Sequence, residues 1–149
     1  MSELMYNQQE FIEAVGELIP AFQRKKIISF IESSQDNEIE YDQMGLSLTG
    51  EKKELSFIIP TSAPNNSDGS LWGAVKREVY DYMCTTSRKY SKERGEAGTT
   101  IKQLITILAT AIASSFHIAI GVVTGAVTIA LLSVLKIGKN AWCKVNTPE

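Results

Sequence analysis

Histidine and cysteine are scarce in this chain of 149 residues, and their scarcity limits the chemistry that the chain can perform. His117 is the only histidine, so any mechanism that needs two histidines is excluded. Cys84 and Cys143 are too few for a disulfide framework, and with His117 they lack the short paired spacings of structural zinc sites. No signature of a catalytic nucleophile surrounds Cys84. We therefore expect a protein that is not an enzyme and that holds neither a metal nor a cofactor.

Signatures of nucleotide and nucleic-acid binding are also missing. Glycines precede a helical pattern in residues 95–100, but the Gly-Lys-Ser/Thr ending of a phosphate-binding loop is absent. The nearest approach to a basic patch with interleaved aromatics lies around Tyr80, Arg88 and Lys89. Residues 1–60 carry eleven acidic and five basic side chains, a net charge of −6, which opposes contact with phosphates. We do not expect nucleic acid as a partner.

A cleavable signal peptide and internal repeats are not found. The first residues, Met-Ser-Glu-Leu-Met-Tyr, are acidic, and no cleavable apolar run follows them. A chain of this length suits a single domain and can bury about 70% of the surface of its unfolded form. These features predict a protein that is not secreted and that lies in the cytoplasm or on the inner face of a membrane.

Charge is absent from one long stretch, and this absence is the strongest feature of the sequence. Residues 103–135 contain no Asp, Glu, Lys or Arg, although 21% of the chain is charged. At about 1.5 Å per residue, a helix of this length reaches roughly 50 Å, which exceeds the roughly 30 Å of a bilayer core. The stretch is therefore a tight apolar hairpin, a single span preceded by a helix that lies elsewhere, or a buried pair of helices in a soluble domain.

The two halves of the uncharged stretch differ in pattern. Residues 101–117 have apolar side chains at helical spacing and a polar face that carries hydroxyls, formed by Thr106, Thr110 and Ser114. Thr100 and Gln103 fit a capping box at its start. Residues 122–137 are almost entirely apolar or small, so this second helix must be enclosed by protein or by lipid. We expect the break between the helices at residues 117–121.

Small residues mark one face of the second helix. Gly121 and Gly125 form a small-xxx-small pair, and Thr124 and Thr128 extend it. Small side chains allow two helix backbones to approach closely, as in transmembrane helix pairs. The pattern fits both packing within the chain and a homo-oligomer.

The first part of the chain has helical spacing over residues 4–31, with an apolar stripe that runs from Phe11 to Phe22. Pro20 interrupts this pattern and predicts two helices or one kinked helix. The basic triplet Arg24-Lys25-Lys26 fits either a solvated face or contact with a membrane surface. Helical spacing returns over residues 71–94.

Between these helical regions the apolar residues alternate. The alternating residues are Ile39 and Tyr41, Leu46 and Leu48, and then Leu55, Phe57 and Ile59, with a turn at residues 49–53. This pattern predicts a β-hairpin. The predicted fold class is thus mainly α with a small β-hairpin (α+β), ending in an apolar helical hairpin over residues 101–137. We divide the chain into an acidic helical and β-hairpin cap, residues 1–70, and a helical region, residues 71–149.

Basic residues flank the uncharged stretch on both sides. They are Arg88, Lys89, Lys92, Arg94 and Lys102 before it, and Lys136 and Lys139 after it. If the stretch enters a membrane, both flanks belong on the cytoplasmic side, and a re-entering hairpin satisfies this requirement.

Two functions of different classes fit these observations. In the first, the C-terminal helical pair inserts into or associates with a membrane, with lipid as the partner, alone or as a pore-forming oligomer. In the second, the chain is a soluble α+β interaction or adaptor subunit with a protein partner and with the hairpin buried as its core. The charge gap, the basic flanks and the glycine pair favour the first function. The amphipathic first helix and the other apolar faces favour the second.

Overall fold

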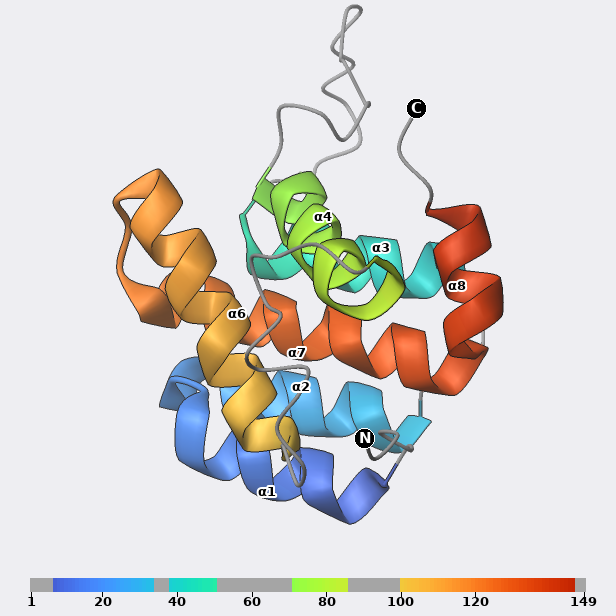
Figure 1. The fold of residues 1–149 in the computed structure, drawn as a ribbon. Coiled ribbons are helices and arrows are strands. Elements are labelled where there is room, and N and C mark those ends of the chain that lie inside the picture. Colours follow the sequence, from blue (N-terminus) through green and yellow to red (C-terminus); the bar gives the residue numbers. More distant parts are fainter. Residues whose placement is uncertain (1–6, 34–37, 51–70, 86–99, 147–149) are drawn as a thin grey trace, which may run out of the picture.

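The computed structural model describes residues 7–33, 38–50, 71–85 and 100–146, and within these ranges it is 88% helical and contains no strand. Seven helices follow one another along the described parts of the chain (Figure 1). They are α1 (Gln8–Leu18), α2 (Ala21–Ser33), α3 (Glu38–Leu48), α4 (Leu71–Cys84), α6 (Ile101–Phe116), α7 (Ile120–Ile137) and α8 (Lys139–Val145).

Helix α7 is the centre of the molecule. It contacts each of the other six described helices, and all residues from Val123 to Val134 are buried. Figure 1 shows α7 crossing the middle of the bundle, with α1 and α2 on one side and α3 and α4 on the other. The most apolar of the described helices is therefore the one that its neighbours enclose, an arrangement that removes its apolar surface from solvent.

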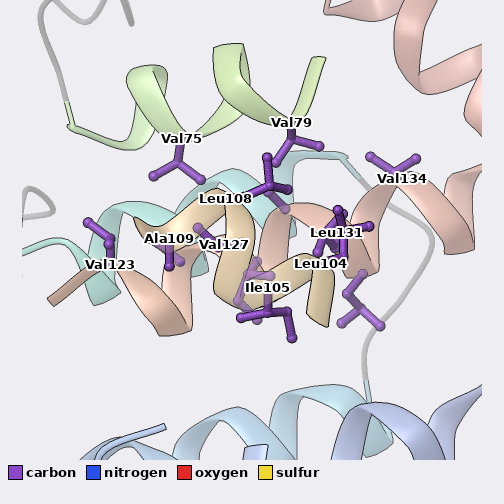
Figure 2. Packing of buried hydrophobic residues seen from close by; sticks show 14 of the residues in the cluster. Val75, Val79, Leu104, Ile105, Leu108, Ala109, Val123, Val127, Leu131 and Val134 are labelled. Carbon is purple, nitrogen blue, oxygen red and sulfur yellow. The ribbon is translucent and has the colours of Figure 1, made fainter. Parts of the chain in front are cut away.

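Helices α6 and α4 cover α7 with aliphatic side chains. Figure 2 shows Leu104, Ile105, Leu108 and Ala109 of α6 lying over Val127 and Leu131 of α7, with Val75 and Val79 of α4 close by. All of these side chains are buried. The amphipathic pattern predicted for residues 101–117 thus turns its apolar face to α7.

The boundaries of α6 and α7 follow the sequence prediction closely. The Thr100 hydroxyl accepts a hydrogen bond from the backbone N–H of Gln103, and the Gln103 side chain accepts one from the N–H of Thr100, so the capping box is confirmed. Helix α6 ends at Phe116, and His117 follows in the left-handed region with φ 56°. Pro20 separates α1 from α2, as predicted.

The predicted β-hairpin is wrong, because its first half forms α3. Tyr41, Gly45 and Leu48 are the buried residues of this segment, and their spacing of four and three residues is that of one helix face. Ile39, which an alternating strand would place on the same side as Tyr41, is 63% exposed. The second half of the predicted hairpin, residues 55–59, lies outside the described residues.

A disulfide joins Cys84, the last residue of α4, to Cys143 in α8, with 5.8 Å between the Cα atoms. The sequence analysis argued only against a disulfide framework, and it did not predict this single bond. The cysteines are 59 residues apart in the chain, and the packing of α8 against α4 brings them together. Such a tertiary relationship leaves no trace in composition.

Candidate functional site

The buried hydroxyl groups of helix α7 are hydrogen-bonded within the helix itself. The hydroxyl of Thr124 donates to the carbonyl of Ile120 at 2.7 Å, and that of Thr128 donates to the carbonyl of Thr124 at 2.9 Å. Ser133 donates to the carbonyl of Ala130 at 2.7 Å. These three are the buried polar side chains among the described residues, so the buried face of α7 requires no polar partner from its neighbours.

The dimensions of α7 also match a bilayer. Its 18 residues have a mean hydropathy of 2.1, and a helix of this length spans about 27 Å. Among the described residues it is the one helix that is long and apolar enough to cross a membrane, and 67% of it is buried in the protein. The core helix of a soluble protein meets the same criteria, so length and composition do not separate the two settings.

The small-residue face of α7 packs within the chain against α2 and the residue before it. A Cβ atom added at Gly125 would lie 2.8 Å from Oε1 of Gln23 and 3.0 Å from Cδ1 of Ile27. At Gly121 it would lie 3.5 Å from Cγ of Pro20, an ordinary contact. Thr124 and Thr128 are buried on the same helix. The glycine pair therefore accommodates α2, and the homo-oligomer remains a prediction.

Exposed apolar side chains gather where α7 begins. Six large hydrophobic residues of the described chain are exposed, and four of them lie close to the α1–α2 or α6–α7 turn: Phe22 (83%), Phe116 (45%), Ile120 (45%) and Val122 (43%). A Cβ atom added at Gly121 would touch Pro20, so the two turns lie close together, and Figure 1 shows them at the same end of the molecule. We refer to these four residues as the apolar end.

The position of Phe22 corrects the sequence prediction, which put it in one stripe with Phe11. Phe11 is buried, whereas Phe22 is mostly exposed, because Pro20 ends α1 and α2 starts with a new orientation. The break at Pro20 was the signal that the stripe could not continue across it.

Three cations follow Phe22 on α2. Arg24, Lys25 and Lys26 are exposed. The Arg24 side chain donates from Nε to the carbonyl of Ile19 at 2.9 Å, and Lys26 donates to the hydroxyl of Ser47. The apolar end therefore has positive charge beside it on α2, the helix that carries Phe22.

The predicted polar face of α6 points to the solvent. Thr106, Thr110 and Ser114 are all exposed, and the hydroxyl of Thr106 donates to the carbonyl of Lys102 at 3.0 Å. This row of hydroxyls lies on the opposite side of α6 from the side chains that cover α7.

The structure describes three of the seven predicted flanking cations. Nζ of Lys102 lies 2.9 Å from Oε2 of Glu17, and this hydrogen bond, followed by the charge of Glu17, raises the pKa of Lys102. Lys136 is half-buried in the last turn of α7, and Lys139 is exposed at the start of α8. The other four, Arg88, Lys89, Lys92 and Arg94, lie outside the described residues.

The residue types that most often bind metals or act in catalysis are dispersed over the described part of the chain. No group of three His, Cys, Asp or Glu side chains able to hold a metal occurs in the described part of the chain. The sulfur of Cys84 is bonded to Cys143, and His117 is exposed in the turn between α6 and α7. The candidate functional features of the described residues are therefore α7 and the apolar end.

Comparison of the chain with protein-family profiles, with curated protein sequences and with solved structures found no significant match.

Proposed function

We propose that this protein is a non-enzymatic membrane-associating protein, which docks through its apolar end and then inserts the α6–α7 pair. The observation that carries the proposal is the exposure of Phe22, Phe116, Ile120 and Val122 near the two neighbouring turns at the end where α7 begins. Exposed apolar clusters on soluble domains mark interaction or membrane sites. Here the cluster adjoins the helix that is best suited to lipid.

The first step is contact with an anionic lipid surface. Burial of one large apolar side chain contributes on the order of 2 kcal/mol, and Phe22 has most of its surface available. Each Lys or Arg near an anionic surface adds about 1 kcal/mol, and Arg24, Lys25 and Lys26 are exposed beside Phe22. Together these terms give reversible binding that depends on anionic lipid.

The second step is insertion, in which α7 exchanges its protein neighbours for lipid. Its threonine and serine hydroxyls are bonded to its own carbonyls, so none of these three hydroxyls loses a partner when the neighbours leave. Its nearest charge, Lys136, lies in the last turn, where a lysine side chain reaches the interface.

Helix α6 follows α7 because a three-residue connection joins them. The Thr106 hydroxyl is bonded within α6, whereas in lipid the exposed hydroxyls of Thr110 and Ser114 need a polar partner. Assembly of several copies around these hydroxyls, with or without water between them, supplies that partner and gives the pore-forming form of the proposal. The protein then works from the cytoplasmic side of the membrane, where both basic flanks remain.

Vesicle flotation with matched variants tests this proposal. A Phe22→Ser/Ile120→Ser variant removes apolar surface from the apolar end, and an Ile39→Ser/Val145→Ser variant removes exposed apolar surface elsewhere. We expect the first to weaken binding to phosphatidylglycerol-containing vesicles by about tenfold or more, and the second to bind like the parent. Equal weakening by both variants, or no binding by the parent, contradicts the proposal.

A soluble interaction subunit is the second candidate, and the enclosure of α7 by six helices favours it. In this case the apolar end docks a protein. The parent chain then remains in the aqueous phase with every lipid composition, and the same Phe22→Ser/Ile120→Ser variant weakens association with protein instead.

A further inference from the structure

We infer that the Cys84–Cys143 disulfide is a redox latch: it holds α8 on the bundle, and its reduction releases α8 and permits α7 to open. The part of this inference that concerns membrane insertion rests on the function proposed above. The release of α8 is a separate statement about the protein in water.

The latch is inferred first from how few side chains of α8 are buried in the bundle. The helix has seven residues, and Trp142 is the only one that is fully buried. Helices this short are marginal on their own and depend on tertiary contacts. Lys139, Lys144 and Val145 are exposed, so they add little to the docking of α8.

The buried side chain that docks α8, Trp142, leaves one polar group unpaired. The indole N–H of Trp142 is buried and has no hydrogen-bond partner among the described residues. A buried donor without an acceptor costs free energy that exposure to water or to a bilayer interface recovers. The unpaired N–H thus offsets part of the stabilisation that burial of the Trp142 ring gives to the docked position of α8, and the bond at the neighbouring Cys143 adds to that stabilisation.

Gly138 provides a hinge between α7 and α8. Its φ of +109° is a conformation that side chains other than glycine rarely adopt, and a Cβ atom there would meet nothing within 4 Å. Rotation at this residue swings α8 away without a change in α7.

The disulfide also restrains the opening of the core. Helix α4 shields α7 with Val75 and Val79 (Figure 2), and α4 ends at Cys84. Because Cys84 is bonded to Cys143, six residues beyond the end of α7, the bond limits how far the end of α4 can move from the end of α7. Cleavage of the bond removes this limit and makes it easier for α7 to exchange α4 for lipid.

Cleavage proceeds by thiol–disulfide exchange with a dithiol reductant. One thiolate of the reductant attacks a protein sulfur, forms a mixed disulfide and releases the other protein sulfur as a thiolate, which takes up a proton. The second thiol of the reductant then displaces the remaining protein sulfur. The reductant leaves as a cyclic disulfide, and two electrons and two protons reside on Cys84 and Cys143. Both cysteines are partly exposed, which allows this attack.

The redox state of the surroundings then selects the form. Reducing compartments keep cysteines as thiols, so the open form prevails in cytoplasm, whereas oxidising surroundings keep the protein closed.

Two single-tryptophan variants test the release of α8. The chain has two tryptophans, Trp72 and Trp142, so Trp72→Phe leaves a reporter on α8 and Trp142→Phe leaves one on α4. On treatment with dithiothreitol we expect Trp142 to become severalfold more accessible to acrylamide and to shift its emission to the red. Trp72 and the helical circular-dichroism signal should not change.

A Cys84→Ser/Cys143→Ser change, added to Trp72→Phe, is the matched control. It should show the exposed Trp142 signal with or without dithiothreitol. A Trp142 that stays shielded after thiol titration shows full reduction overturns the latch. Loss of the helical signal on reduction also overturns it, because the bond then holds the whole fold together and not α8 alone.

Vesicle insertion separates the latch from the proposed function. With phosphatidylglycerol-containing vesicles, we expect insertion by the reduced protein and the double serine variant, and little by the oxidised protein. Equal insertion by oxidised and reduced protein overturns the latch and leaves the proposed function intact. Release of Trp142 without insertion in either redox state supports the latch and overturns the proposed function.

Discussion

The indole ring of Trp72 occupies the space that a side chain at Gly45 would need. A Cβ atom added at Gly45 would lie 2.3 Å from Cδ2 of Trp72, so α3 and α4 interlock at this point. Asp42, one turn earlier on α3, accepts hydrogen bonds from Nε1 of Trp72 and from Nζ of Lys76, both at 2.9 Å. This junction fixes two of the helices that enclose α7.

Replacement of Gly45 by Ala should destabilise the protein. The added methyl group overlaps an aromatic ring that is buried and hydrogen-bonded, and overpacking of this kind costs about 1–3 kcal/mol. Gly16→Ala is the matched control, because a Cβ atom added at Gly16 in α1 would meet nothing within 4 Å. This variant should raise the free energy of unfolding by about 0.5–1 kcal/mol. Urea denaturation of both variants measures the two free energies. Equal changes would show that Trp72 does not restrict Gly45.

The contact between α7 and α2 predicts different responses at its two glycines. Gly125→Leu forces a large side chain against Gln23 and Ile27, and we expect a loss of about 1–3 kcal/mol or more. Gly121→Ala should be tolerated, since its Cβ makes an ordinary contact with Pro20. Thermal unfolding and sedimentation velocity should be measured together. A stable Gly125→Leu variant that loses only self-association would assign this face to an oligomer.

Removal of the disulfide should lower the free energy of unfolding without abolishing the fold. A bond that spans 59 residues restricts the unfolded chain, and the loop-entropy relation gives about 4 kcal/mol for this length. Denaturant unfolding of the Cys84→Ser/Cys143→Ser variant, compared with the oxidised parent, measures this difference. Identical midpoints in the two proteins would mean that the bond does not restrict the unfolded state.

The Lys102–Glu17 pair predicts a change of stability at alkaline pH. The folded protein raises the pKa of Lys102 above its ordinary value of 10.5, mainly through the hydrogen bond to Glu17. The stabilisation is therefore complete below that ordinary value and is lost as the pH rises through the raised pKa. Glu17→Gln should remove this pH dependence, and Glu13→Gln should change it less, because Glu13 has only a weaker charge effect on Lys102. Unfolding curves of the parent and of both variants, measured across the alkaline range, test this expectation. Identical pH profiles for the parent and Glu17→Gln would contradict the role of Glu17 in raising the pKa of Lys102.

Sequence patterns located the helix pair α6 and α7 well because the signals there are local. The capping residues Thr100 and Gln103, the break near His117 and the apolar periodicity each act within a few residues of the chain. The composition of α7 could not predict that protein surrounds this helix, because a lipid-facing helix and a core helix share that composition.

Other features depended on tertiary structure. In α3, Ile39 and Tyr41 alternate with polar residues, yet the helix buries only Tyr41 because α7 and α4 lie on that side. The exposure of Phe22 follows from the restart of the helix after Pro20. The pairing of Cys84 with Cys143 follows from the docking of α8, which no local pattern encodes.

Carbonate extraction of the reduced protein after incubation with phosphatidylglycerol-containing vesicles tests the central claim most directly, namely that α7 can leave its protein core for lipid. Carbonate removes proteins that bind a surface through charge and leaves those whose helices are inserted. We predict that the parent chain stays with the vesicles. An Ala126→Arg variant, with a charge in the buried middle of α7, should be extracted, because the charge costs about 2.5–3.5 kcal/mol at a helix centre in lipid. Quantitative recovery of the parent chain in the supernatant would contradict the account.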